Sequence, residues 1–337
     1  MRNKINYFLT GLMSSLFLMI ILALPIIAEP VSSQCPDETR ALGLPVVRWQ
    51  DCRLPVRAVV VAVHGFTLYT ESFDSTARHL ASRGYVVYGS DLRGFGRWRE
   101  EPEKFDGDST IDYGASRDDL IMLLKELRKQ YRDKQIILMG ESMGANLAVW
   151  VASCKPQLID GLILSALCYK QRVKPRWRWI PDTLKGLFNP LTPMSLDPYV
   201  REDVSHNPDI ITSYLKDSNI RLDVTPVKLV KVALVNRVSL SDVDKIPAEL
   251  PILIVCGEKD RLFKTRSVPR IVNKMGSNNV DFHVLAGWGH LILEAQTLDD
   301  RVGKILDDWI DISLSDRRVS LDANLEPGAG EKMSAKP

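Results

Sequence analysis

Short runs of apolar residues, bounded by turn-forming residues, recur along the chain. Such runs are typical of strands that are buried on both faces of a sheet. They predict strands at 58–63, 85–91, 136–139, 161–166, 252–257 and 280–285. Helical spacing separates them and is clearest at 113–131, where Leu120, Leu123, Leu124 and Leu127 share one face. Strands that alternate with helices predict an α/β fold with a mostly parallel central sheet and helices on both faces.

One interval breaks this alternation. Residues 169–247 contain no buried-strand signal but include helical segments at 210–216 and 226–240. We interpret this interval as an inserted helical cap that folds over the functional site. The sheet domain is then made of 34–168 and 248–314, with a last helix at 298–312 and a disordered tail at 315–337.

The N-terminus has a different pattern. Arg2 and Lys4 precede an uncharged apolar run at 5–28. The positive-inside rule places the rest of the chain across the membrane. Two interpretations of residues 1–33 stay open: a signal peptide cleaved before Gln34, or a retained membrane anchor. Both predict an exported protein, either anchored to the membrane or periplasmic or secreted.

Composition adds little to this picture. The 337 residues are 45% hydrophobic and 26% charged, with a net charge of +2, which gives no indication of a nucleic-acid partner. Of the five cysteines, Cys35 and Cys52 fall where a disulfide can form in an oxidising compartment. Cys154, Cys168 and Cys256 have apolar neighbours that are typical of core positions. No spacing resembles a metal site, so no metal or cofactor is predicted.

The strand at 136–139 leads into Gly140-Glu141-Ser142-Met143-Gly144, a G-x-S-x-G pattern. In a nucleophile elbow, a serine occupies a sharp turn between a strand and a helix. The flanking glycines remove the Cβ atoms that would collide with the neighbouring strand and helix. The helix that follows directs backbone N–H groups at the serine, where they can receive an oxyanion. Ser142 is therefore the candidate nucleophile.

A serine nucleophile needs a histidine base and an acid that orients it. His290 lies in a loop directly after the last predicted strand, at the sheet edge where Ser142 also lies, and we take it as the base. Asp260 follows the strand at 252–257 and is the predicted acid, with Glu258 as the alternative. An aspartate there also fits a simple turn that caps the next helix.

The oxyanion needs a second N–H besides that of Met143. His64-Gly65-Phe66 follows the first predicted strand, and the N–H of Phe66 is the predicted donor. His64 itself is interpreted as a structural, hydrogen-bonded residue.

Together these segments resemble the monoacylglycerol lipase and lysophospholipase branch of the α/β-hydrolases, often grouped with the serine aminopeptidase-like hydrolases. The resemblance runs from about residue 58 to residue 312 and rests on VVVAVHGF, SDLRGFGR, GESMGA, LPILIVCGEKD and VLAGWGHLILE. It implies an α/β-hydrolase fold, a metal-free Ser142, Asp260 and His290 triad, and a cap that gates a lipid or ester pocket.

The expected function is cleavage of carboxylic esters such as monoacylglycerol or lysophospholipid through an acyl-enzyme on Ser142. Two alternatives stay open: a peptidase of the serine aminopeptidase type, and a non-catalytic envelope binding protein on a hydrolase scaffold. Within the predicted cap, Trp177 and Trp179 alternate with basic residues, which favours contact with an anionic membrane surface but equally fits a solvated cap edge. The sequence does not predict an oligomeric state.

Overall fold

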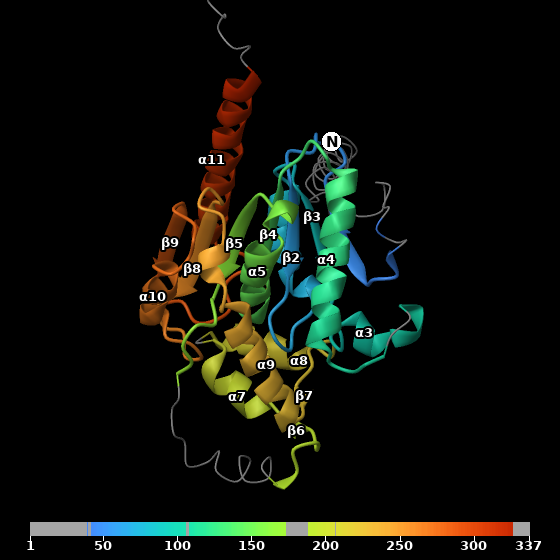
Figure 1. Cartoon of the computed structure of the whole chain (residues 1–337). Helices are drawn as coiled ribbons and strands as arrows, with labels where there is room; N and C mark the ends of the chain where they lie inside the picture. The colour runs from blue at the N-terminus through green and yellow to red at the C-terminus, as the bar shows by residue number, and fades with distance from the viewer. Residues whose placement is uncertain (1–38, 40–41, 106–107, 173–187, 206, 326–337) are drawn as a thin grey trace, which may run out of the picture. The chain divides into compact units, whose positions relative to one another are not determined.

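A seven-stranded sheet forms the centre of the computed structural model (Figure 1), in the order β1-β3-β2-β4-β5-β8-β9. Its strands are β1 Val46–Trp49, β2 Val59–Val63, β3 Val86–Ser90, β4 Ile136–Glu141, β5 Gly161–Ser165, β8 Ile252–Gly257 and β9 Val280–Leu285. All neighbours pair in parallel except β1, which is antiparallel to β3. The structure describes residues 39, 42–105, 108–172, 188–205 and 207–325, all within the unit Cys35–Pro337.

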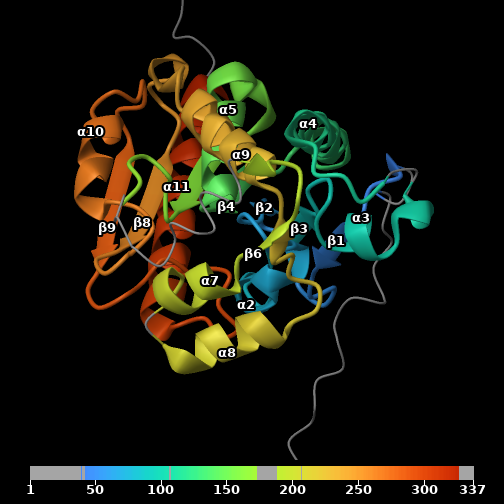
Figure 2. The ribbon, with the colours of Figure 1, turned by 90° about the horizontal axis from the view of Figure 1, so that it is seen from below.

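Helices cover both faces of this sheet (Figure 2). They are α2 Asp74–Ala81, α3 Arg97–Glu100, α4 Tyr113–Gln130, α5 Met143–Cys154, α10 Val268–Val272 and α11 Asp300–Leu325. Alternate strand residues explain the two layers: Val59 and Val61 pack in the cluster that contains α4 and α5, whereas Val60 and Ala62 pack in the cluster that contains α2 and α11. A strand buried on both faces therefore reads as a continuous apolar run.

The interval without a sheet strand forms a separate layer at the carboxyl ends of the parallel strands, below the sheet in Figure 1. Its elements are β6 Met194–Ser195, α7 Asp197–Asp203, α8 Pro208–Lys216, β7 Asp223–Val224 and α9 Pro226–Ser239. We call this layer the cap. It is helical as expected, except that β6 and β7 pair in a small antiparallel ladder. Short 3-10 helices occur in the core and the cap at Thr70–Phe73, Pro102–Lys104, Pro156–Leu158, Val243–Lys245 and Thr265–Ser267.

The α/β fold class is as predicted, but two boundaries differ. Strand β1 was not predicted, because its four residues are only half buried at the sheet edge and include Arg48. The last helix continues past Ile312 to Leu325, so residues 315–325 are helical rather than part of a disordered tail. Residues 326–337 lie outside the described part of the chain.

Residues 1–33 also lie outside the described part, so the signal peptide or anchor stays a prediction. Among the helices that the structure describes, none combines the length and the apolar character that a membrane crossing requires. Cys52 is disulfide-bonded, whereas Cys154, Cys168 and Cys256 are free. Cys168 and Cys256 are buried as predicted, but the core position predicted for Cys154 is wrong, since this last residue of α5 is exposed. Trp177 and Trp179 fall in the undescribed residues 173–187, and their membrane contact stays a prediction.

Candidate active site

Ser142 occupies a sharp turn between β4 and α5. Its φ of 56° is rare for a residue with a side chain. The flanking glycines make the turn possible. A Cβ on Gly140 would lie 2.4 Å from the backbone of Gly144, and a Cβ on Gly144 would lie 1.9 Å from the carbonyl oxygen of Val63 in β2. The predicted strand-to-helix turn is therefore present, and both glycines are required by close backbone approach.

The structure brings Ser142, His290 and Asp260 together. The Ser142 Oγ lies 2.9 Å from His290 Nε2, and His290 Nδ1 lies 2.8 Å from Asp260 Oδ2. A carboxylate only accepts hydrogen bonds, so Nδ1–H donates to Asp260 and Nε2 of the neutral ring accepts from the Ser142 hydroxyl. The three side chains form the continuous arrangement that activates a serine nucleophile.

Asp260, rather than its alternative Glu258, is the acid that faces His290. The second carboxylate oxygen of Asp260 accepts the N–H groups of Leu262 and Phe263 at 2.7 and 2.9 Å, which fixes its orientation. Glu258 is exposed and accepts the N–H of Gly287 at 3.0 Å instead. Asp260 thus also has the turn role that the sequence allowed, since one of its oxygens holds the loop while the other contacts the histidine.

Charge pairing controls the ionisation of this site. Burial alone would lower the pKa of His290, but the charge of Asp260, the hydrogen bond to it and the charge of Glu141 outweigh burial and raise that pKa above its ordinary value of 6.5. Burial would raise the pKa of Asp260, but the charge and hydrogen bond of His290 and two backbone N–H groups lower it. Both shifts favour the ion pair that forms when His290 takes up a proton.

The predicted oxyanion donors lie next to Ser142. Phe66 follows β2 and Met143 is the first residue of α5, and both line the cavity that contains Ser142. Across the described residues, neither N–H donates to another protein group. They are therefore available to an oxygen of a bound ligand. His64 has the structural role expected of it, because its ring contacts Gly65 O at 2.8 Å and accepts the N–H of Leu92 at 2.9 Å.

Two buried carboxyl groups beside the site were not predicted. Glu141 accepts the N–H groups of residues 292–294 at 2.5–3.0 Å, and Glu294 accepts the N–H of Gly65 at 3.0 and 3.1 Å. Burial, and then the charge of Glu141, raise the pKa of Glu294 well above its ordinary value, which favours its neutral form. For Glu294, the available sequence signal was its place directly after the apolar run 291–293. These groups connect the elbow, the loop that contains His290, and the loop at residues 64–67 that contains Phe66, which we call the oxyanion loop.

Cys168 also contacts the candidate nucleophile. Its Sγ lies 3.3 Å from the Ser142 Oγ, and its backbone exchanges two hydrogen bonds of 3.0 Å with the Asn146 side chain on α5. Burial raises the pKa of the Cys168 thiol, so the thiol stays neutral. The prediction of a buried core cysteine is correct, but its contact with Ser142 carried no sequence signal.

A cavity of about 1240 Å³ lies between the sheet edge and the cap, and Ser142 and His290 line it. The cap contributes mainly apolar side chains to its wall, among them Leu196, Val200, Leu229, Val232 and Leu240. This volume exceeds the roughly 300–1,000 Å³ of ordinary small-molecule pockets. Among the described residues, no cluster of His, Cys, Asp or Glu has the arrangement of a metal site.

Comparison with known proteins agrees with this geometry. The sequence profile of the family described as "Serine aminopeptidase, S33" matches residues 55–296. The chain is 26% identical over 169 residues to the monoglyceride lipase homologue of Monkeypox virus, a match that covers 50% of this chain and 58% of that protein. It is 23% identical over 239 residues to the monoacylglycerol lipase of Mycolicibacterium smegmatis, covering 69% of this chain and 81% of that protein.

Solved structures show the same fold. The monoacylglycerol lipase of Paleococcus ferrophilus aligns with a TM-score of 0.61 at 19% identity, covering 81% of this chain and 98% of that chain. A soluble variant of the monoglyceride lipase of Saccharomyces cerevisiae aligns with a TM-score of 0.64 at 17% identity, covering 80% and 91%. The resemblance stated from the sequence, to the monoacylglycerol lipase branch of the α/β-hydrolases, is confirmed.

Proposed function

This chain belongs to the serine aminopeptidase, S33, family, and from that membership we propose that it cleaves carboxylic esters of lipids through an acyl-enzyme on Ser142. The observation that carries the proposal is the hydrogen-bonded series Ser142, His290 and Asp260, with 2.9 and 2.8 Å between its members. A histidine held by a carboxylate is the base that a serine hydroxyl needs to become a nucleophile near neutral pH.

The reaction has two halves. The Ser142 Oγ attacks the ester carbonyl carbon while its proton passes to His290 Nε2, and Asp260 stabilises the imidazolium. The N–H groups of Phe66 and Met143 receive the oxyanion, and losing one such donor typically costs about 3 kcal/mol of barrier. The intermediate then expels the alcohol, which takes the proton from His290. Water attacks the acyl-enzyme with His290 as base, the acid leaves, and Ser142 regains its proton.

The cavity supports a lipid substrate. An acyl chain needs a long apolar space, and about 1240 Å³ with an apolar cap wall provides it. Relatives named monoacylglycerol and monoglyceride lipases support the same class. We therefore propose monoacylglycerols, lysophospholipids or similar lipid esters as substrates.

The family description keeps a peptidase as the second candidate. An aminopeptidase needs an anionic group for the free amino terminus of its substrate. Glu294 lines the cavity, but its raised pKa favours the neutral acid and its oxygens already accept the Gly65 N–H. Glu294 is therefore unsuited to that role, but Asp203 and Asp244 also line the cavity, so the substrate panel distinguishes the peptidase from the esterase.

The test compares the wild type with Ser142→Ala on p-nitrophenyl esters of graded chain length and on aminoacyl p-nitroanilides. We expect ester turnover in the wild type and a loss of about 10⁶-fold in kcat in the variant, because the nucleophile is absent. Circular dichroism establishes that both proteins are folded.

A fluorophosphonate probe gives an independent measurement. Labelling that requires Ser142 supports the acyl-enzyme. Retained ester turnover in Ser142→Ala contradicts it, faster anilide than ester turnover favours the peptidase, and an unlabelled, inactive wild type favours a non-catalytic binding protein.

A further inference from the structure

Besides Ser142 in the elbow, Thr67 is a second residue with a strained backbone. It lies in the oxyanion loop, directly after the proposed donor Phe66. Its φ is 75°, although it is not a glycine. A β-branched residue in this region is a conformational outlier and persists only where its surroundings hold it. The contacts of Thr67 therefore indicate what keeps the oxyanion loop in its present shape.

Two of the contacts of Thr67 come from the cap. The hydroxyl of Tyr214, on α8, forms a short hydrogen bond with Thr67 Oγ1, and the N–H of Arg221 donates to Thr67 O at 2.9 Å. Thr67 Oγ1 also bonds the carbonyl oxygen of Phe66. The Thr67 hydroxyl has one proton and donates it in the hydrogen bond to Phe66 O. In the bond with Tyr214 it therefore accepts, and the Tyr214 phenol is the donor. The hydrogen bonds thus run from α8 through Thr67 to the carbonyl of Phe66, the residue whose own N–H is the proposed donor.

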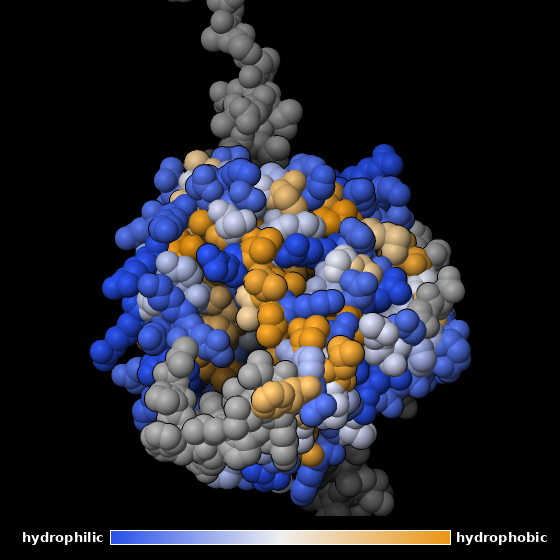
Figure 3. All heavy atoms as spheres, turned by 60° about the horizontal axis from the view of Figure 1, so that its bottom comes forward, coloured by the Kyte–Doolittle hydropathy of each residue, from blue (hydrophilic) through white to orange (hydrophobic). Residues whose placement is uncertain are grey.

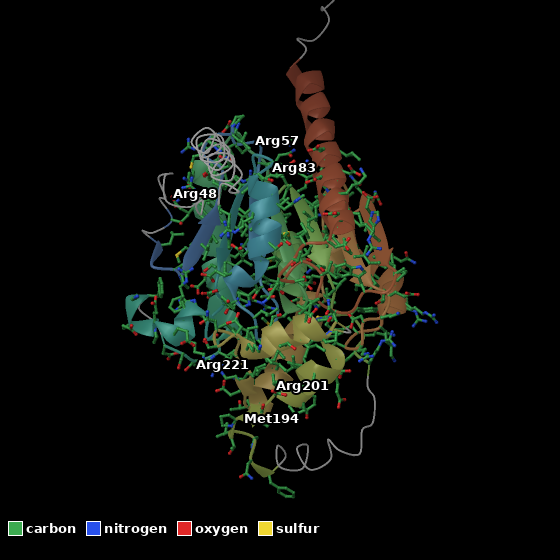
Figure 4. All side chains as sticks on the ribbon, turned by 180° about the vertical axis from the view of Figure 1, so that it is seen from behind. Arg48, Arg57, Arg83, Met194, Arg201 and Arg221 are labelled. Atoms are coloured by element: carbon green, nitrogen blue, oxygen red, sulfur yellow. The ribbon has the colours of Figure 1, made fainter. Side chains whose placement is uncertain are left out.

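Arg221 anchors the same part of the cap to the sheet domain. Its guanidinium donates to Gly94 O and Ser109 O at 2.7 Å each, and Figure 4 labels it where the cap meets the core. Tyr214 is itself buried, with 7% of its surface exposed. The position of α8 at Thr67 is therefore well defined.

The core holds the other side of the loop. Gly65 donates its N–H to the buried carboxyl of Glu294 at 3.0 and 3.1 Å. The residue before Phe66 is thus fixed by the sheet domain, and the residue after it is fixed by the cap. The direction of the Phe66 N–H depends on both.

We propose that Tyr214 is a positioning residue that couples the seating of the cap to the oxyanion hole. With α8 in place, its hydroxyl holds Thr67 in the strained conformation and directs the Phe66 N–H at the oxyanion. When α8 moves away, Thr67 relaxes and the donor is lost. This inference rests on the proposed function, because the donor role of Phe66 belongs to that proposal.

The test uses Tyr214→Phe in the full chain, which removes the hydroxyl and keeps the buried ring. We expect kcat to fall about 10-fold or more while KM changes less, because a displaced donor weakens the transition state and spares ground-state binding. An alkyl boronic acid imitates the tetrahedral intermediate, so its inhibition constant is expected to rise by the same factor as kcat/KM falls. Binding of a fatty acid, which needs no oxyanion donor, is expected to stay unchanged.

Tyr69→Phe is the matched control. The Tyr69 hydroxyl donates to Asp217 Oδ2 at 2.8 Å. Like the bond of Tyr214, this hydrogen bond joins the core to the cap, but it does not involve Thr67. Its kcat and its boronate inhibition constant are expected to match the wild type. A purely structural role of cap bonds would affect both tyrosine variants alike.

A second variant approaches the same bond from the core side. Thr67→Val keeps the β-branch and removes the hydroxyl, so it is expected to lose kcat as Tyr214→Phe does, with no further loss in the double variant. The role of Tyr214 is overturned if kcat or the boronate inhibition constant of Tyr214→Phe is unchanged, or if Tyr69→Phe loses as much activity. In that case fluorophosphonate labelling of wild-type Ser142 still supports the proposed function. A wild type that is neither labelled nor active overturns both.

Discussion

At the scale of single residues, the protonation state of His290 controls the proposed reaction. It is buried between Ser142 and Asp260, and the carboxylate raises its pKa above 6.5 despite its burial. As the proposed base, His290 accepts a proton only when its ring is neutral. Activity should therefore be lost as the pH falls through a pKa that lies above 6.5, rather than below it.

Asp260→Asn tests this electrostatic account. Without the carboxylate, burial lowers the pKa of His290, so the acidic limb of kcat/KM against pH is expected to move to lower pH. In addition, kcat is expected to fall about 10³–10⁴-fold because the histidine loses its orientation. Stopped-assay profiles between about pH 4 and pH 9, which extend to both sides of the ordinary histidine pKa, measure both effects. Glu258→Gln is the matched control, since that carboxylate contacts Gly287 and not His290. An unshifted limb in Asp260→Asn contradicts the account.

The sequence identified residues whose roles follow from their place after a strand. Ser142, Asp260 and His290 each follow an apolar run, and parallel strands bring their carboxyl ends to one edge. Tyr214 could not be found in this way, because its partner Thr67 is 147 residues away and neither has a local signal. The positive φ of Thr67 was equally hidden, since threonine gives no indication of such a conformation.

At the scale of elements, α9 has two apolar faces. Leu229, Val232 and Ala233 line the cavity, whereas Val230, Leu234 and Val238 are 51–61% exposed. These exposed residues recur every four positions, so they form one stripe along the helix. Figure 3 shows apolar side chains gathered among polar ones on this face of the cap. Such a stripe on a helix that also has the exposed residues Lys231 and Arg237 favours contact with an anionic lipid surface.

Co-sedimentation with vesicles that contain phosphatidylglycerol tests this contact. Leu234→Glu is expected to lower the bound fraction several-fold, because it places a charge in the apolar stripe, while turnover of a soluble p-nitrophenyl ester is unchanged. Ile312→Glu is the control, since Ile312 is 62% exposed on α11 and not on the cap. Both variants keep the N-terminal apolar run, so a difference between them is attributable to α9. Equal binding of the two variants excludes the stripe as the contact.

Most strands were predictable because their burial is uniform, whereas β9 was predicted although only Leu285 in it is fully buried. Strands β2, β4 and β8 are buried at every position; β2 and β8 appear as apolar runs, and β4 does so until it reaches Gly140 and Glu141. Strand β1 was missed because only Trp49 is fully buried. In the cap, α7 was missed because its short amphipathic stretch, Asp197–Asp203, has few buried residues, and its position depends on contacts with α8 and the core.

At the scale of the whole molecule, the disulfide at Cys52 supports export. Disulfides persist in oxidising compartments and are rare in the cytosol. We therefore propose that the reaction takes place outside the cytoplasm. The mass of the protein purified from its native envelope is expected to correspond either to the full 337 residues or to a chain that begins near Gln34. A full-length chain recovered in the cytosolic fraction with a reduced Cys52 would argue against export.

The separation of the candidate nucleophile and base along the chain has a consequence for biogenesis. Ser142 and His290 are 148 residues apart, and the segment between them includes the entire cap and strands β8 and β9. A ribosome therefore completes the elbow long before it completes the base. Until β9 has paired and the loop after it has docked, Ser142 is an ordinary, unreactive alcohol. On the proposed mechanism, reactivity with a serine-directed probe is therefore expected only in chains whose last strand has folded into place.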